Sequence, residues 1–214
     1  MSTDTAPAPA PTPAPGTPIH REDVDVVGRR WRMGVLLLIV ADASFVAALL
    51  FSYRYLRGLN TEGAWLAQGS ATAPIWSSWA LAAGLLLSAV VFRWGEQGVR
   101  GGDSARLVLG GGIGVVLLVL VAVGQVVQIA GFPFAIADSA YASAMYVLAG
   151  ANLFHLLLTL FLGVAMWNRG RLGRYSATEH WQVGIVSMWW SWVALAAVLS
   201  ALTTSFIASP AVGG

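Results

Sequence analysis

The chain has 214 residues, of which 57% are hydrophobic and only 10% are charged, and its mean hydropathy is +0.70. Because soluble domains carry about 25% charged residues, this composition excludes an ordinary soluble protein. Cysteine is absent, which excludes disulfides, thiolate metal sites and cysteine nucleophiles, and the net charge of +2 gives no reason to expect a nucleic-acid partner.

The order of segments along the chain predicts one membrane domain between two tails. Residues 1–28 begin with alternating Ala and Pro, which cannot form a helix or bury a core, so we expect a disordered cytoplasmic tail rather than a signal peptide. Residues 29–208 form the membrane domain, and 209–214 a short outer tail. Since about 20 apolar residues cross a bilayer, we expect an all-α polytopic membrane protein with five transmembrane helices, near 33–55, 75–93, 107–130, 143–166 and 184–207.

The basic residues predict the orientation of these helices. All twelve are arginines, and ten of them precede the first span, lie between spans two and three, or lie between spans four and five. Only Arg54 and Arg57 fall on the opposite side of the membrane. Because arginine and lysine collect on the cytoplasmic side, we expect the N-terminus in the cytoplasm and the C-terminus outside.

Two patterns in the later spans are assigned to helix packing. The glycines of GGGIG (110–114) lack the preceding strand of a phosphate-binding loop, so we interpret them as small residues that allow close helix contact. The start of span five is rich in tryptophan, as in an aromatic belt at a membrane interface. We interpret these side chains as anchors and packing residues rather than cofactor ligands: Trp181, Trp189, Trp190 and Trp192.

Two titratable side chains, Asp42 and His155, lie inside the predicted spans. A carboxylate at mid-span costs about 2.5–3.5 kcal/mol on insertion scales, so Asp42 is expected either to have a function or to bond to a polar group on another span. His155 shares a helix face with Asn152 and Thr159, and a structural hydrogen bond, a proton relay and a ligand role all stay open for it. One buried histidine cannot supply the ligands of a bis-histidine haem or of a copper or zinc site. We therefore expect no catalytic residue, metal or cofactor on this chain.

Two segments in the first half of the chain match known motifs. Residues 31–57, WRMGVLLLIVADASFVAALLFSYRYLR, combine W-R-x-G, an apolar run and Y-x-Y-L-R, with Asp42 where the pattern has a glutamate. GQVVQI (124–129) is similar to Q-x-x-E-[YW], with Gln125 on the glutamine and Gln128 in place of the glutamate.

Two further motifs follow in the same order. YASAMYVLAGANLFH (141–155) is similar to Y-x-S-x-x-Y-x-L-T-G-x-H-x-x-H, with His155 kept and Asn152 in place of the first histidine. WWSWVA (189–194) stands where the pattern has Y-W-H-F-V-D. With these motifs the chain resembles subunit III of the haem–copper cytochrome c oxidases, in the short five-helix bacterial form, as a divergent member.

This resemblance implies a non-catalytic subunit of a bacterial terminal oxidase, which reduces O2 to water and translocates protons in the aerobic respiratory chain. Such a subunit lies in the cytoplasmic (inner) membrane, contacts the catalytic subunit I and subunit II, which hold the haem and copper, and binds phospholipid. A larger respiratory supercomplex is a further expected partner. Subunit III stabilises the catalytic subunit and supports proton uptake and O2 access. The candidate proton-handling or subunit-interface residues are then Asp42, His155, Asn152, Gln125 and Gln128.

Three other functions stay open. An accessory subunit of a nitric oxide reductase complex would have the same fold and a different partner. A small proton-coupled transporter would use Asp42 as the proton carrier, although such folds contain inverted repeats and broken helices, neither of which is clear in this sequence. A scaffolding or assembly protein would need none of the polar residues. The partner that purifies with the chain distinguishes these possibilities.

Overall fold

The computed structural model describes residues 23–60, 65–66 and 69–207, and within them the regular structure is entirely helical. The five helices are α1 (Val24–Gly58), α2 (Ile75–Arg100), α3 (Ser104–Ala130), α4 (Ala140–Arg171) and α5 (Trp181–Thr204). Each is long and apolar enough to cross a membrane, which confirms the predicted five-helix membrane fold. Most of the predicted N-terminal tail and all of the predicted outer tail lie outside the described residues.

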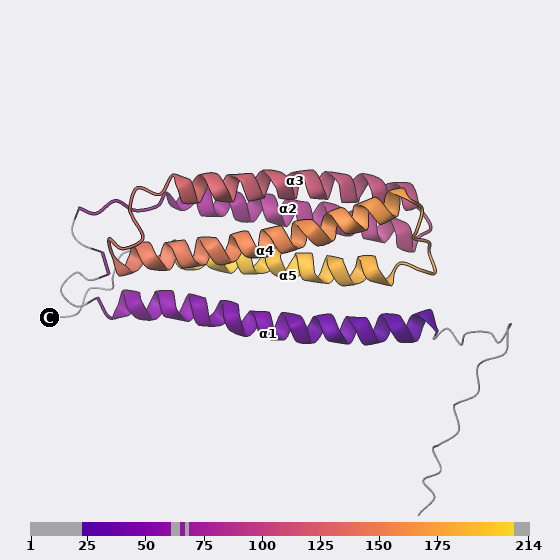
Figure 1. Ribbon diagram of the computed structural model, residues 1–214, viewed down its shortest axis with the longest axis horizontal. Coiled ribbons are helices and arrows are strands. Elements are labelled where there is room, and N and C mark those ends of the chain that lie inside the picture. Colours follow the sequence, from indigo (N-terminus) through magenta and orange to yellow (C-terminus); the bar gives the residue numbers. More distant parts are fainter. Residues whose placement is uncertain (1–22, 61–64, 67–68, 208–214) are drawn as a thin grey trace, which may run out of the picture.

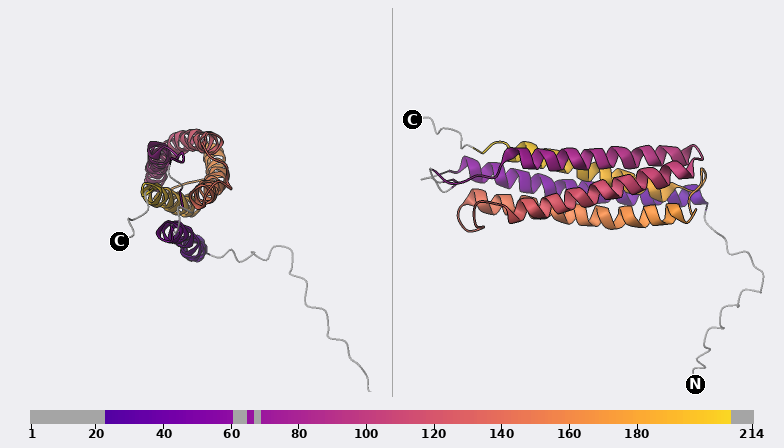
Figure 2. Two further views of the ribbon diagram at one scale, coloured as in Figure 1. Left: turned by 90° about the vertical axis from the view of Figure 1, so that its left-hand side faces the viewer. Right: turned by 90° about the horizontal axis from the view of Figure 1, so that it is seen from above.

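Helices α2 to α5 alternate in direction and form a ring, and α1 lies against its outside (Figure 1). Around the ring, α2 packs against α3 and α5, and α4 packs against the same two helices. The view along the bundle in Figure 2 shows this ring with α1 beside it. Among the helices, α1 contacts only α4 and α5, and its buried residues are Val46 and Tyr53. Most of the apolar surface of α1 is therefore exposed.

Glycines bring α2 and α3 into close contact. A Cβ atom on Gly110 would lie 2.9 Å from the Cα atom of Gly95 and 2.9 Å from the carbonyl oxygen of Val91, which is closer than side-chain carbons approach. Close van der Waals packing of this kind holds helices together in lipid, where the hydrophobic effect does not drive their association. The prediction that the glycines of the third span serve close helix contact is confirmed.

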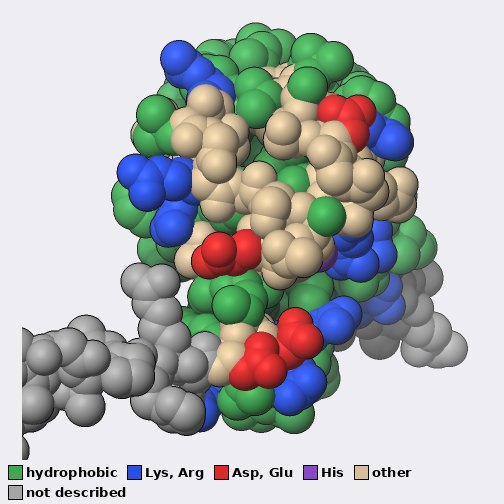
Figure 3. All heavy atoms as spheres, turned by 90° about the vertical axis from the view of Figure 1, so that its right-hand side faces the viewer, with side chains coloured by type: hydrophobic (Ala, Val, Ile, Leu, Met, Phe, Trp, Pro, Cys, Tyr) green, Lys and Arg blue, Asp and Glu red, His purple; other side chains and the backbone are tan. Residues whose placement is uncertain are grey.

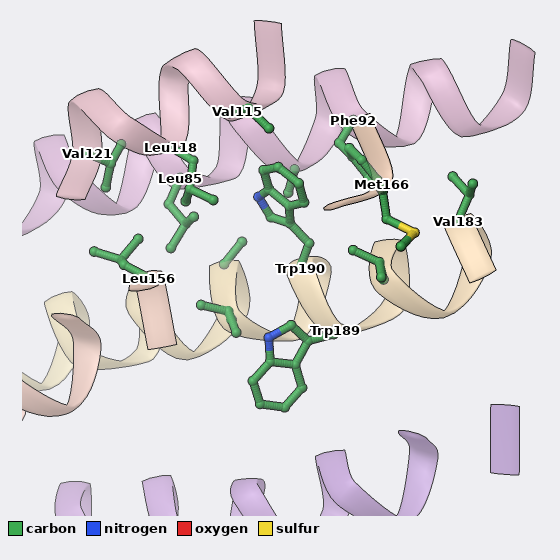
Figure 4. Packing of buried hydrophobic residues seen from close by; sticks show 14 of the residues in the cluster. Leu85, Phe92, Val115, Leu118, Val121, Leu156, Met166, Val183, Trp189 and Trp190 are labelled. Atoms are coloured by element: carbon green, nitrogen blue, oxygen red, sulfur yellow. The ribbon is translucent and has the colours of Figure 1, made fainter. Parts of the chain in front are cut away.

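Trp190 lies at the centre of the ring, where its indole points from α5 toward α2 and α3 (Figure 4). The indole stacks on Phe92 with 4.5 Å between ring centroids, and its nitrogen donates a hydrogen bond to Ser88 Oγ at 2.9 Å. A Cβ atom on Gly163 would lie 2.8 Å from the same ring, so this glycine makes room for it. Trp189 projects to the other side of α5 and is also buried. The packing role of both tryptophans is confirmed, and their interpretation as interfacial anchors is wrong.

Helices α1 and α2 extend beyond the predicted spans where polar side chains support their ends. α1 begins at Val24, because the Asp23 carboxylate accepts a hydrogen bond from the backbone of the first turn at 3.1 Å, so residues 24–28 are helical rather than part of the tail. α2 continues past residue 93, where Glu96 pairs with Arg100 one turn later. Opposite charges four residues apart stabilise a helix. A span predicted from apolar residues alone ends where the charged residues begin, so the prediction for α2 was too short.

Arginines collect at the end of the bundle where α1 begins, here called the arginine-rich end. Figure 3 views this end and shows basic side chains at several places around it. Because the helices alternate in direction, arginines that are far apart in sequence meet there. The described arginines at this end are Arg29, Arg30, Arg32, Arg93, Arg100, Arg106, Arg169, Arg171 and Arg174, and those at the opposite end are Arg54 and Arg57.

Candidate functional site

Asp42 lies on the face of α1 that packs against the ring, and its carboxylate contacts two other helices. Its Oδ1 atom lies 2.9 Å from Nε2 of His155 on α4, and its Oδ2 atom accepts a hydrogen bond from Nε1 of Trp192 on α5 at 2.7 Å. The side chain of Asp42 is 15% exposed and that of His155 only 3%. These three side chains therefore join α1, α4 and α5 at one point.

The imidazole of His155 is enclosed by aromatic rings. The ring centroids of Phe45, Phe154 and Trp189 lie 6.5, 5.9 and 6.1 Å from its own. Thr159, one turn further along α4, donates a hydrogen bond to the carbonyl oxygen of His155 at 2.7 Å and accepts one from Trp189 Nε1 at 3.1 Å. The histidine is thus fixed by its aromatic surroundings and by the contact at Nε2.

Each carboxylate oxygen of Asp42 has a hydrogen-bonding partner, His155 or Trp192. An ionised carboxylate that accepts from an imidazole N–H and an indole N–H has a donor for each oxygen, which offsets the cost of removing it from water. A second proton on the imidazole would give it a positive charge that balances the charge of the carboxylate. The pair can hold a proton and hold helices together. Among the residues that the structure describes, no group of three or more His, Cys, Asp or Glu side chains could bind a metal ion.

The candidate residues Gln125 and Gln128 connect α3 to α2. Gln125 Nε2 donates to Gln128 Oε1 at 2.7 Å, and Gln128 Nε2 donates to Ser77 Oγ at 2.7 Å and Ser78 Oγ at 3.2 Å. Together with Asn152 on α4, the two glutamines line a cavity of about 30 Å³ inside the ring, large enough for a water molecule. This polar group lies in the ring, apart from the contact between α1 and the ring.

The five candidate residues thus fall into two sets, and sequence reasoning missed two further residues. The sequence analysis interprets Trp192 as an interfacial tryptophan, although an indole N–H that is removed from water needs an acceptor and another span contains a carboxylate. The predicted second span ends before Glu96, although this residue is 4% exposed within α2 and bonded to Arg100. The four-residue spacing of Glu96 and Arg100 is typical of a helix, and this signal could have extended the predicted second span to Arg100.

The sequence matches one protein family over most of its length. Residues 17–206 match the family model described as cytochrome c oxidase subunit III. The chain is similar to cytochrome c oxidase subunit 3 of Synechocystis sp., with 26% identity over 161 residues, which cover 75% of this chain and 68% of that protein. It is also similar to cytochrome c oxidase subunit 3 of Yarrowia lipolytica, with 25% identity over 161 residues, covering 71% of this chain and 58% of that protein. The family match includes all five helices and both sets of candidate residues.

Proposed function

The chain belongs to the cytochrome c oxidase subunit III family, and from this we propose that it is the non-catalytic subunit III of a bacterial haem–copper terminal oxidase. Membership makes it a multi-pass membrane subunit of an oxidase complex. The observation that carries the rest of the proposal is the contact of Asp42 with His155 and Trp192. This contact uses the mid-span carboxylate of α1 to hold α1 against α4 and α5.

In this proposal α1 is the helix that meets the catalytic subunit. Its side chains include large apolar groups that are mostly exposed, such as Leu37 (63%), Val40 (63%) and Phe51 (67%). Since α1 has few buried residues of its own, the Asp42 contact would contribute to how firmly that surface is held. Subunits I and II would carry the haem and copper, this chain would bind none, and phospholipid would cover apolar surface left by the partners.

The proposed location is the bacterial cytoplasmic membrane, with the arginine-rich end in the cytoplasm, as the positive-inside rule requires. Held in this orientation, the subunit would stabilise the catalytic subunit and support its proton uptake and O2 access. Asp42, His155, Asn152, Gln125 and Gln128 would act in this through helix packing and subunit contact.

Purification of the tagged chain from its native membranes in a mild detergent tests the proposal. We expect larger subunits to elute with it and the eluate to show a haem spectrum, whereas the chain expressed alone should show no Soret band and no stoichiometric iron or copper. Elution without a haem-containing partner, or a Soret band from the isolated chain, would overturn the proposal. A partner that reduces nitric oxide rather than O2 would assign the chain to the alternative complex.

A further inference from the structure

The arginine-rich end contains a pocket of about 310 Å³ between α1, α2 and the start of α5. Glu96, which is buried, is bonded to one of the arginines in its wall. Four arginines and two carboxylates line the pocket, which leaves an excess of two positive charges among these six side chains. The charged residues that line it are Arg29, Arg32, Arg93, Arg100, Asp25 and Glu96.

Helix α5 begins in this pocket, and its N-terminus adds to the positive potential. Its N-cap residue, His180, makes no side-chain hydrogen bond to the first turn, and His180, Trp181 and Gly184 line the pocket. The exposed amides and the dipole at a helix N-terminus favour anions. The indole of Trp181 is stacked on that of Trp31 with 6.2 Å between centroids, which ties α1 to α5 beside the pocket.

A buried hydroxyl in the wall of the pocket has no partner. Ser187 is 2% exposed and lines the pocket, and its Oγ atom makes no hydrogen bond to any residue that the structure describes. Buried polar atoms are almost always hydrogen-bonded, so an orphan hydroxyl beside a cluster of arginines indicates a missing acceptor or donor. This observation is independent of the charge of the pocket and also indicates a ligand.

We propose that this pocket binds a phosphate group. Phosphate oxygens accept paired hydrogen bonds from guanidinium groups, and they suit the amides of a helix N-terminus and the Ser187 hydroxyl equally well. The pocket lies at the end of the membrane-spanning helices, where the phosphate can come from a phospholipid headgroup or from a small phosphate in solution. The inference depends on this chain alone and not on the identity of its partner subunits.

Binding to the full-length chain, purified in a maltoside detergent and stripped of lipid, tests the proposal. One arm titrates inorganic phosphate by calorimetry. A second arm adds phosphatidylglycerol and counts the lipids retained by native mass spectrometry, with an uncharged galactolipid as the phosphate-free control. Binding of inorganic phosphate shows that the phosphate group suffices, and selective retention of phosphatidylglycerol alone shows that a headgroup is required. Binding of neither probe, or equal retention of both lipids without phosphate binding, overturns the proposal.

Variants locate the binding. The double substitution Arg32→Gln and Arg93→Gln should weaken binding at least about tenfold, as expected for the loss of charge-assisted hydrogen bonds, and Ser187→Ala should weaken it to a smaller extent. Arg174→Gln removes the same charge from the same end but lies outside the pocket lining, so it should bind as the wild type does. Each variant must melt at the same temperature as the wild type, which shows that it is folded. If the double variant does not fold, the single variant Arg93→Gln is used in its place. Unchanged binding in the arginine variants, or an equal loss in Arg174→Gln, contradicts the proposal.

Discussion

The indole nitrogen of Trp192 donates a hydrogen bond to Asp42 Oδ2 at 2.7 Å, although the two residues are 150 positions apart in the sequence. This bond joins α5 to α1, the helix with the fewest buried residues. The other carboxylate oxygen contacts His155. The carboxylate in the middle of an apolar helix is therefore explained by two donors on neighbouring helices, and its loss should first loosen α1.

Asp42→Leu should release the subunit from its complex more readily than the wild type. Leucine leaves the Trp192 and His155 nitrogens without their acceptor, at a cost of about 1–3 kcal/mol for each buried group. The measurement is the amount of this chain retained on the complex after graded detergent washing. Val123→Leu, at an exposed position of α3, a helix that does not contact α1, is the control. Equal retention of the two variants would show that the carboxylate does not hold α1.

Trp192→Phe keeps an aromatic ring and removes only the N–H donor. We expect a loss of about 1.5–3 kcal/mol, typical of a hydrogen bond to a charged group, measured as a lower melting temperature of the full chain in detergent. In the Asp42→Leu background the same substitution should cost less, because the bond is already absent. Trp76→Phe, at a position 72% exposed, is the control. Additive effects of the two substitutions would contradict the contact.

Gly110→Ala should destabilise the bundle, since the new methyl group would meet the backbone of α2 at 2.9 Å. The helices must separate or shift to admit it, at a typical cost of about 1–3 kcal/mol. Gly150→Ala is the control, because a Cβ atom there has no neighbour within 4 Å. The fraction of monodisperse protein that survives heating compares the two. A more stable Gly110→Ala variant would refute the close contact of α2 and α3.

The proposed orientation predicts the location of reporter fusions. A reporter fused after Gly214 should be active outside the cytoplasm, and one fused after Arg171, at the arginine-rich end, should be active inside. The physical reason is the retention of arginine on the cytoplasmic side during insertion. The reverse pattern would invert the proposed topology, and activity of both fusions on one side would contradict five spans.

The fold was largely predictable from the sequence, because spans of about 20 apolar residues have few structural alternatives in a bilayer. The ends of the helices were less predictable. Glu96 and Arg100 are charged and yet helical, since each neutralises the other within one turn. At the start of α1, the Asp23 cap extends the helix into a segment that composition alone assigns to a tail.

The candidate site was predictable only in part. Asp42 and His155 stand out in the sequence because they are polar residues within apolar spans. Their pairing depends on how α1 rotates against α4, and the third member, Trp192, depends in addition on how α5 lies. Tryptophan suits both a membrane interface and a helix core, so composition does not distinguish Trp192 from an anchor. The packing of α5 against α1 places the Trp192 indole beside Asp42 and so determines its role.

Oxygen consumption by membranes that carry Asp42→Asn tests the central claim most directly. Asparagine keeps an oxygen that can accept from Trp192. Its amide N–H can donate to Nε2 of His155 when the imidazole carries its hydrogen on Nδ1, but the amide has no proton to exchange. If the carboxylate holds α1 against the ring, the variant should assemble fully and consume oxygen at nearly the wild-type rate per haem, with at most a modest loss during sustained turnover. A variant that assembles fully and consumes no oxygen would show that Asp42 carries protons, and would contradict the structural role assigned to it.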